Sequence, residues 1–346
     1  MYALILAGGK GTRLRPLTIY TPKPIVPVVS RPFLLYQLDI LAKAKIKDIT
    51  LSLSYQPDKI EDLLGDGSQH GVNLKFVTES SPMGTAGAYR FASGDYRETA
   101  VVLNGDILTS IDIAKVVDFH RSKNADATIV LSSVSEPSKY GLVEADKDGK
   151  VLRFLEKPSV EEAARLNVNT INAGIYILEP AVLDLIPEGE NASFEYEVFP
   201  KLLEAGISFF AYTMETGYWR DIGTPDSYLE AHHDLLAGRV EGVPDIESGE
   251  SETATTAIID SSSVIGEGCI IKSNARITNS VLGPGVHVDE KALITGSVIW
   301  PYARISTYAE ITDSIVGKGS HIGRNVVLRP GSVIGDKATI PDYSRA

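Results

Sequence analysis

The C-terminal part of the chain repeats itself every 17 residues. The tetrapeptides Ile277-Thr-Asn-Ser, Ile294-Thr-Gly-Ser and Ile311-Thr-Asp-Ser keep this step, and aliphatic residues six, six and five positions apart keep it with them. The aliphatic columns are Ile265, Leu282, Ile299, Val316; Ile271, Val288, Ile305, Ile322; and Ile277, Ile294, Ile311, Leu328. Such a period predicts a triangular parallel β-solenoid with one column per face, and twelve agreeing positions favour it over a β-sandwich with coincidental spacing.

The first half of the chain alternates short β-rich runs with helical patterns. Strands are predicted over 2–7, 49–55, 74–77, 100–103 and 128–134, and helices over 33–44, 59–64, 86–92 and 113–122. This alternation predicts an α/β fold, a Rossmann-like open, largely parallel sheet with helices on both faces. Ligands of such sheets bind beyond the carboxyl ends of the strands, where the loops 8–11 and 104–106 lie.

The domain boundary is predicted from composition. A chain of 346 residues has the length of about two domains. A helix is predicted over 225–237, and the segment after it is rich in glycine and acidic residues, which is typical of a linker. We therefore expect a domain over 1–237, a linker over 238–255 and the solenoid over 256–346.

The charge balance argues against nucleic acid and membrane surfaces as partners. The chain has 33 basic and 45 acidic residues, so its net charge of -12 gives no general attraction to nucleic acid or to a membrane surface. One cysteine, Cys269, forms no internal disulfide. The first residues lack a signal-peptide pattern, and no apolar run reaches the length of about 18 residues that spans a membrane. We expect a cytoplasmic protein.

One segment has the opposite charge. Residues 1–38 contain five basic residues and no acidic one; the basic residues are Lys10, Arg13, Arg15, Lys23 and Arg31. The loop Gly8-Gly-Lys-Gly-Thr-Arg13 follows the first predicted strand, where a phosphate-binding loop belongs. It fits neither a Walker loop, because Gly11 follows Lys10, nor a dinucleotide fingerprint, because Leu14 stands where Gly or Ala is needed. Backbone N–H groups and fixed cations nevertheless predict an anion site; a tight turn with solvated basic residues is the alternative.

The same segment is similar to the signature of a known family. Leu6-Ala-Gly-Gly-Lys-Gly-Thr-Arg-Leu-Arg-Pro-Leu-Thr18 with Thr21-Pro-Lys-Pro24 resembles the sugar-1-phosphate nucleotidyltransferases, or nucleotide-sugar pyrophosphorylases. Further motifs follow in family order: Gly84-Thr-Ala-Gly87, Asn104-Gly-Asp106, Lys139-Tyr-Gly141, Phe154-Leu-Glu-Lys-Pro158, Asn172-Ala-Gly-Ile-Tyr176 and Trp219-Arg-Asp-Ile-Gly-Thr-Pro225. The solenoid resembles the left-handed hexapeptide-repeat β-helix of several members, which supplies a handedness that the spacing does not.

The resemblance implies nucleotidyl transfer from an NTP to a sugar 1-phosphate, with pyrophosphate as the second product. Both reactants are anionic, so positioning and charge neutralisation carry the reaction, and no covalent nucleophile is required. By resemblance, Arg13 and Lys23 neutralise the α-phosphate and the leaving pyrophosphate. Lys157 holds the sugar phosphate, and we expect Pro158 to keep its backbone extended. Asp106 and Asp221 hold Mg²⁺, although a lone Asp after a strand is more often a cap or turn residue.

The implied binding residues divide between the two substrates. The nucleotide-binding positions are Leu6, Ala7, Gly8, Gly9, Gly11, Thr12, Gly84, Thr85 and Asn104. The sugar-binding positions are Gly141, Glu156 and Asn172.

Substrate choice rests on three segments. Residues 136–141, 169–176 and 194–200 look most like the mannose-1-phosphate guanylyltransferases of the family, which implies GTP and mannose 1-phosphate. Tyr196 departs from the basic residue more usual there. Glucose-1-phosphate thymidylyl-, adenylyl- or uridylyltransferase is the alternative within the family. A noncatalytic subunit that binds a nucleotide sugar is disfavoured because the implied catalytic set is complete, and a purely structural scaffold leaves the basic N-terminal segment unexplained.

The remaining predictions concern four histidines and the open end of the solenoid. His232 and His233 are adjacent on a predicted helix and point to different faces, so we expect structural or solvated roles. His287 and His321 lie on the solenoid, where hexapeptide-repeat acyltransferases keep a catalytic histidine. The regular coils leave no space for the long loops that such acyltransferases usually carry, which disfavours acyl transfer. The open end of the solenoid predicts a homo-oligomer formed through this domain.

Overall fold

The computed structural model describes residues 1–134, 136–159, 161–162 and 168–346. It consists of two compact units: the first comprises 1–9 and 36–219, and the second comprises 10–35 and 220–346. The basic segment after Gly9 therefore belongs to the same unit as the C-terminal solenoid, whereas the sequence analysis assigned it to the domain over 1–237.

The first unit is built on a nine-stranded sheet. Its strands, in sheet order, are β10 (Val151–Glu156), β9 (Gly141–Ala145), β11 (Thr170–Leu178), β6 (Ala100–Asn104), β1 (Tyr2–Leu6), β4 (Asp48–Leu53) and β5 (Asn73–Thr78), and β8 (Ala127–Ser133) pairs with β11 and with β12 (Phe209–Thr213). The five predicted strands are confirmed as β1, β4, β5, β6 and β8.

The sheet is mixed, and β12 pairs in parallel with β8. β6, β1, β4 and β5 are parallel, as predicted, so their carboxyl ends meet at one edge. β11 runs antiparallel to both β6 and β8. The β9–β10 hairpin lies between β8 and β11 in the chain, and antiparallel pairing needs no helical crossover.

Helices cover both faces of this sheet. They are α1 (Leu34–Lys43, which begins in the second unit), α2 (Pro57–Leu64), α3 (Gly84–Ser93), α4 (Ile113–Ser122), α6 (Pro180–Leu183) and α7 (Phe199–Glu204), with a π-helical turn η5 (Phe194–Val198). On one face Tyr2 and Leu4 pack with Tyr89 of α3 in the main core. On the other, the His120 ring of α4 lies 2.8 Å from the Thr128 hydroxyl of β8. Burial on both faces explains the nearly continuous apolar runs of the parallel strands.

The second unit joins the basic segment, one long helix and the solenoid. Its short elements are η1 (Thr12–Leu14), η2 (Lys23–Ile25), β2 (Pro27–Val28) and β3 (Arg31–Pro32). Helix α8 (Pro225–Leu236) confirms the predicted helix and ends one residue earlier than expected. Its N-cap is Thr224, whose hydroxyl accepts a hydrogen bond from the Ser227 N–H at 3.3 Å. Shorter elements elsewhere are η3 (Ser68–His70), η4 (Pro137–Lys139), β7 (Ile107–Thr109) and β13 (Trp219–Asp221).

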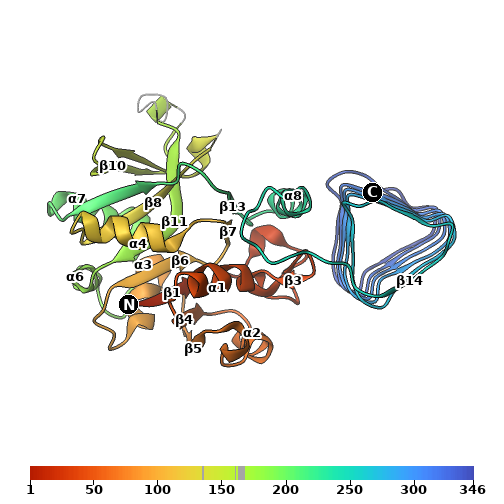
Figure 1. The fold of residues 1–346 in the computed structure, drawn as a ribbon, viewed down its shortest axis with the longest axis horizontal. Coiled ribbons are helices and arrows are strands. Elements are labelled where there is room, and N and C mark those ends of the chain that lie inside the picture. Colours follow the sequence, from red (N-terminus) through yellow and green to blue (C-terminus); the bar gives the residue numbers. More distant parts are fainter. Residues whose placement is uncertain (135, 160, 163–167) are drawn as a thin grey trace. The chain divides into compact units, whose positions relative to one another are not determined.

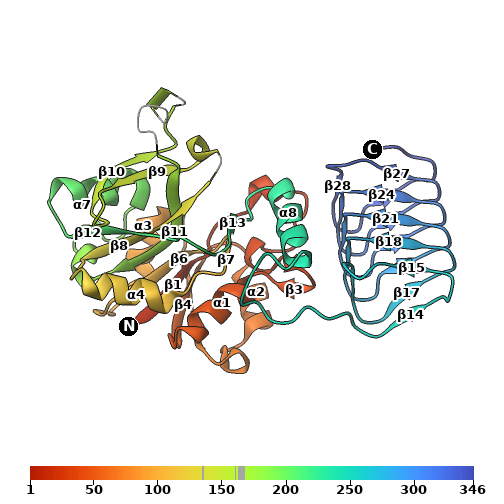
Figure 2. The same ribbon diagram turned by 45° about the horizontal axis from the view of Figure 1, so that its top comes forward.

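The solenoid is a three-sided parallel β-helix, triangular in Figure 1 and seen as stacked coils in Figure 2. One sheet contains β14 (Ser251–Thr253), β17 (Cys269–Ile271), β20 (His287–Val288), β23 (Arg304–Ile305), β26 (His321–Ile322) and β29 (Thr339–Ile340). A second contains β15 (Ile258–Ile259), β18 (Arg276–Thr278), β21 (Leu293–Thr295), β24 (Glu310–Thr312) and β27 (Val327–Leu328). The third contains β16 (Val264–Ile265), β19 (Val281–Leu282), β22 (Val298–Ile299), β25 (Ile315–Val316) and β28 (Val333–Ile334).

The predicted aliphatic columns are confirmed by the strand register. Ile277 pairs with Ile294, which pairs with Ile311, and the other two columns stack in the same way. All three columns lie in one buried core. The first strand, β14, lies inside the segment expected as a linker, so the coils begin before residue 256. Among the residues that the structure describes, no helix is both long and apolar enough to span a membrane.

Candidate active site

The first unit places the end of β1 beside two other strand ends. The Ala7 N–H donates to the Ser52 carbonyl at 2.9 Å, and the Gly105 N–H donates to the Leu6 carbonyl at 2.9 Å. A Cβ atom at Gly105 would lie 2.8 Å from the Leu6 carbonyl oxygen, so glycine is needed for this close approach. The predicted nucleotide-binding residues Leu6, Ala7 and Asn104 thus lie at the carboxyl edge of the parallel strands, as the α/β rule predicts.

A buried carboxylate lies next to Gly8. Glu79 follows the last residue of β5 and is 9% exposed. Its Oε1 accepts a hydrogen bond from the Ser52 hydroxyl at 2.8 Å, and its Oε2 accepts one from the Met83 N–H at 3.2 Å. A Cβ atom at Gly8 would lie only 3.1 Å from Oε1. The sequence analysis missed Glu79; the available signal was an acidic residue directly after a predicted strand and five positions before Gly84.

The motif that contains Gly84 and Thr85 packs against the loop before η5. A Cβ atom at Gly84, where φ is +69°, would lie 2.4 Å from the Ala192 carbonyl oxygen. The Thr85 hydroxyl donates to Glu195 Oε2 at 2.8 Å and accepts from the Phe194 N–H at 2.9 Å. These contacts hold the first turn of α3 against η5, and they connect the predicted base-binding segment to Glu195.

The predicted sugar-binding residues come together in the antiparallel part of the sheet. Gly141 pairs with Glu156 across β9 and β10, and a Cβ atom at Gly141 would lie 2.6 Å from Glu156 Oε2. Asn172 donates to the Tyr176 hydroxyl at 2.9 Å, and its Oδ1 accepts from the Gly174 N–H at 2.8 Å. Asn104 is adjacent, because a Cβ atom at Gly174 would lie 2.7 Å from its Nδ2.

The electrostatics of this group favour hydroxyl binding. Burial raises the pKa of Glu156, the charge of Glu195 adds to this effect, and Lys157 opposes it. Burial also raises the pKa of Tyr176 well above its ordinary value. Glu156 is thus a partly desolvated carboxylate, which suits a site for the hydroxyl groups of a sugar, and the fully buried Tyr176 supports this site through its hydrogen bond with Asn172.

Lys157 contradicts one expectation. Its Nζ lies 3.6 Å from Glu156 Oε1, but its backbone has a φ of +44°, in the left-handed region, and is not extended. The Lys157 N–H donates to the Tyr140 carbonyl at 3.2 Å, which extends the antiparallel pairing of β9 and β10 one step beyond Gly141 and Glu156. At this strand end the backbone does not follow the local preference of a residue before proline.

The second unit brings further predicted residues close to one another. Gly11 has a φ of +61°, and a Cβ atom there would lie 3.0 Å from Cβ of Lys23. The Thr18 hydroxyl donates to the Gly11 carbonyl at 2.7 Å and fixes the loop before η1, which contains Thr12 and Arg13. A Cβ atom at Gly223 would lie 2.7 Å from Asp221 Oδ2 and 3.3 Å from both terminal nitrogens of Arg13. The Arg13 guanidinium and the Asp221 carboxylate therefore both lie next to Gly223.

The predicted catalytic residues are divided between the units. Asp106 and Lys157 belong to the first unit, and Arg13, Lys23 and Asp221 belong to the second. In the described part of the chain no group of three or more His, Cys, Asp or Glu residues could hold a metal ion. Asp106 and Asp221 are both half-buried carboxylates, and such hard oxygen donors suit a cation that takes its other ligands from phosphates and water.

The histidines that the sequence analysis discussed have structural partners. His232 is buried, which lowers its pKa to about 4, and its Nδ1 lies 2.8 Å from the Tyr228 carbonyl. His233 Nε2 lies 2.8 Å from the Gly296 carbonyl. His321 Nε2 lies 3.0 Å from the Ser306 hydroxyl, and His287 Nε2 lies 3.6 Å from Asp289 Oδ1.

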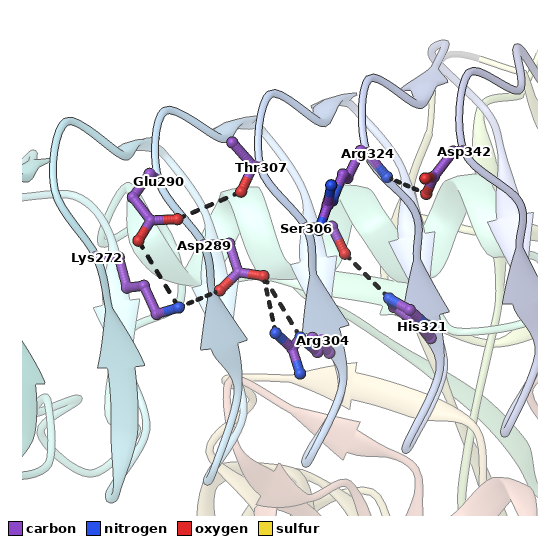
Figure 3. Close-up of a pocket in the computed structure, with 9 residues that line it drawn as sticks. All are labelled: Lys272, Asp289, Glu290, Arg304, Ser306, Thr307, His321, Arg324 and Asp342. Carbon is purple, nitrogen blue, oxygen red and sulfur yellow. Dashed lines mark hydrogen bonds and ion pairs between the residues drawn. The ribbon is translucent and has the colours of Figure 1, made fainter.

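One side of the solenoid has a polar cavity of about 460 Å³ (Figure 3). Lys272 Nζ lies 2.7 Å from Asp289 Oδ1, and Arg304 donates to Asp289 Oδ2 at 3.2 Å. Burial acts to raise the pKa of Asp289, but the hydrogen bonds from Lys272 and Arg304 outweigh it and lower that pKa. The charges thus compensate one another across neighbouring coils, and none of the predicted catalytic or substrate-binding residues lines this cavity.

Comparisons with known proteins match two consecutive parts of the chain. Residues 2–238 match the family model described as nucleotidyl transferase, and residues 247–345 match the model described as the EIF2B subunit epsilon LbH domain. LbH stands for left-handed β-helix, so the handedness implied by the resemblance is confirmed. Members of the nucleotidyl transferase family generally use a divalent metal ion.

Individual relatives are similar over most of their length. A mannose-1-phosphate guanylyltransferase of Mycobacterium tuberculosis is 38% identical over 284 residues, which cover 80% of this chain and 77% of the relative. A mannose-1-phosphate guanylyltransferase catalytic subunit beta of Drosophila pseudoobscura is 40% identical, with 78% of this chain and 71% of the relative covered. A solved structure described as a putative glucose-1-phosphate thymidylyltransferase of Bacillus anthracis, in complex with a sucrose, superposes with a TM-score of 0.62 at 25% identity over 71% of this chain and 97% of that one.

Proposed function

The chain belongs to the nucleotidyl transferase family, and we propose that it transfers the guanylyl group of GTP to mannose 1-phosphate, giving GDP-mannose and pyrophosphate. The similarity to two named guanylyltransferases supports this assignment. The observation that carries the choice of base is Glu79, the buried carboxylate beside Gly8.

The chemistry of Glu79 favours guanine over the other bases. Guanine presents two adjacent donors, N1–H and the N2 amino group, and a carboxylate with about four acceptor positions can accept from both. Adenine has an acceptor at N1. Uracil and thymine place two carbonyl oxygens around their single N3–H, and these would face the negative charge. A site that hydrogen-bonds one substrate in this way rejects analogues strongly, because its buried polar group is left unpaired.

The proposed reaction is an in-line displacement at the α-phosphorus. A phosphate oxygen of mannose 1-phosphate forms the new P–O bond as the bond from the α-phosphorus to the pyrophosphate oxygen breaks, and pyrophosphate leaves with the electron pair. We assign Arg13 and Lys23 to the negative charge of the triphosphate and Lys157 to the sugar phosphate. Glu156 and Asn172 orient the sugar through its hydroxyl groups.

We also propose Mg²⁺ as the divalent ion, held by the carboxylates of Asp106 and Asp221. When bound, such an ion neutralises phosphate charge and orients the reacting groups. The protein's own contribution is to supply two half-buried carboxylates and to leave the remaining coordination positions to the substrates.

The test is a pyrophosphate-release screen of GTP, ATP, UTP and dTTP against mannose 1-phosphate and glucose 1-phosphate. We expect GTP with mannose 1-phosphate to give the highest kcat/KM. Glu79→Gln should reduce kcat/KM for GTP by roughly 10- to 100-fold, the loss expected for one hydrogen bond to a charged group, and should leave UTP unchanged or improved. Ser52→Ala is the matched control, because it removes a partner of Glu79 and keeps the carboxylate. Faster turnover of another pair by the wild-type protein would refute the substrate assignment.

We further propose that the chain forms a homo-oligomer through the solenoid. β14 and β29 are the outer strands of their sheet, and such edges are normally covered. Three tyrosines of the solenoid, Tyr302, Tyr308 and Tyr343, are exposed. Light scattering after size exclusion should give a mass above the 37.3 kDa of one chain, and a monomer at micromolar concentration would contradict this proposal.

A further inference from the structure

One position of the solenoid repeat is occupied by a small residue in most coils and by a large side chain in one. The residue after the first aliphatic column, which Ile334 continues, is glycine at Gly266, Gly283, Gly317 and Gly335 and tryptophan at Trp300. Cβ atoms at the first three of these glycines would lie 2.5, 2.7 and 2.6 Å from atoms of the next coil, so this corner of the triangle is crowded. Trp300 nevertheless keeps its place in the ladder, where its N–H donates to the Val316 carbonyl at 2.8 Å. A side chain at so crowded a position calls for a specific reason.

The Trp300 side chain contacts helix α8. It is 2% exposed, and its indole Nε1–H donates to the Tyr228 hydroxyl at 2.9 Å. The two rings meet edge to face, with centroids 6.5 Å apart and an interplanar angle of 63°. The Tyr228 hydroxyl in turn donates to the Pro27 carbonyl. Since the hydroxyl accepts from Trp300 and donates to Pro27, the indole fixes the direction in which the tyrosine proton points.

This chain of bonds ends next to the predicted catalytic residues of the second unit. Pro27 begins β2, and only Val26 separates it from η2. The first residue of η2 is Lys23, whose carbonyl accepts a hydrogen bond from the Val26 N–H at 3.2 Å. Ser227, the neighbour of Tyr228, donates through its hydroxyl to the Asp221 carbonyl. The first turn of α8 therefore contacts the segment of Lys23 on one side and that of Asp221 on the other.

Two more contacts join the solenoid to the same elements. His233 of α8 lies 2.8 Å from the Gly296 carbonyl, which belongs to the coil of Trp300. A Cβ atom at Gly335 would lie 3.1 Å from Cβ of Pro16, three residues after Arg13. The coils thus contact both α8 and the basic segment.

We propose that Trp300 is a positioning residue for nucleotidyl transfer: through Tyr228 it holds α8, and with it Lys23 and Asp221, in the arrangement that the reaction needs. The inference rests on the proposed function for its kinetic readout. Through Trp300 the solenoid would influence the rate of the reaction, in addition to any role in assembly.

The test compares Trp300→Phe with Tyr228→Phe in the full-length chain. The first removes the indole N–H and keeps a buried ring; the second removes the hydroxyl that receives it. We expect each to lower kcat about tenfold, to raise the Mg²⁺ concentration at half-maximal rate, and to leave KM for mannose 1-phosphate within about twofold, because the predicted sugar residues belong to the first unit. The double variant should be little slower than the worse single one, because both substitutions break one chain of bonds.

A structural readout separates this proposal from the proposed function. Amide exchange in peptides that cover 10–35 and 221–228 should rise in Trp300→Phe, while peptides from the solenoid core stay protected. Ile294→Val, a change in the solenoid core, is the matched control and should move neither kcat nor exchange in those peptides. If the wild-type chain turns over no substrate pair, the proposed function fails while the exchange experiment still decides the role of Trp300. The proposal is overturned if Trp300→Phe keeps the wild-type kcat, Mg²⁺ dependence and amide exchange. It is also overturned if Trp300→Phe loses protection equally throughout the chain.

Discussion

Gly223 offers the sharpest test of the second unit's part in catalysis. It lies next to both the Asp221 carboxylate and the Arg13 guanidinium, and its backbone is outside the left-handed region, so alanine adds no backbone strain. The new Cβ would lie 2.7 Å from Asp221 Oδ2, whereas ordinary van der Waals contact begins at 3.4 Å. In Gly223→Ala the carboxylate oxygen must therefore retreat by about 0.7 Å.

The displacement should affect activity far more than stability. Asp221 is half-buried and its carboxylate can rotate, so we expect the free energy of unfolding to change by less than about 1 kcal/mol. A misplacement of about 1 Å in a site that works by positioning can cost about a hundredfold in rate. We expect kcat to fall roughly 30- to 100-fold, and the Mg²⁺ concentration at half-maximal rate to rise, if Asp221 is a ligand.

The assay is pyrophosphate release at varied GTP, mannose 1-phosphate and Mg²⁺, with thermal melting as the measure of folding. KM for mannose 1-phosphate should stay near the wild-type value. Wild-type kcat and Mg²⁺ dependence in a folded Gly223→Ala protein would show that the Arg13–Asp221 pair has no part in the reaction. A large loss of melting temperature would show instead that the carboxylate is held rigidly by the fold.

Four other substitutions test the remaining parts of the molecule. Gly141→Ala places a Cβ atom 2.6 Å from Glu156 Oε2, so KM for mannose 1-phosphate should rise about tenfold or more with unchanged Mg²⁺ dependence; a normal KM would exclude Glu156 from the sugar site. Asp106→Asn and Asp221→Asn should each cost roughly a hundred- to a thousandfold in kcat, and the double variant should be little slower than the worse single one, whereas fully additive losses would argue for separate functions. Burial lowers the pKa of His232 to about 4, so the imidazole binds a proton more readily in the unfolded chain than in the folded one. The free energy of unfolding should therefore fall by roughly 3 kcal/mol as the pH drops from 6.5 to about 4. His232→Asn keeps a donor for the Tyr228 carbonyl and should flatten that dependence in urea titrations; an unchanged slope would mean that another group titrates.

Local motifs predicted where several candidate residues lie, because these residues belong to contiguous segments. Ala7 and Gly8 follow β1, and Asn104 is the last residue of the neighbouring strand β6, so the α/β pattern alone places them at one edge of the sheet. Glu79 was missed because a single acidic residue after a strand has no characteristic spacing. Its importance depends on contacts with Ser52, Met83 and Gly8, which come from three different segments.

Two other outcomes show tertiary contacts overriding local rules. Proline after Lys157 predicted an extended backbone, but the lysine, which pairs with the Tyr140 carbonyl at the end of β10, is in the left-handed region. The predicted domain over 1–237 joins the segment after Gly9 to β1, whereas the contacts within the chain group this segment with α8 and the solenoid. Neither outcome is visible in periodicity or composition, because both depend on residues far apart in the chain.

The solenoid shows what a periodicity argument leaves out. Twelve aliphatic positions that agree identify the fold, and this agreement comes from the residues that point into the core. A contact that singles out one coil comes instead from a residue that breaks the pattern, because a perfect repeat presents the same surface on every coil. Trp300 is such a break: it stands where the neighbouring coils have glycine, and its indole leaves the coil to meet Tyr228. In a repeat domain, therefore, the regular positions predict the architecture, and an irregular position with a large amphipathic side chain predicts where that architecture docks.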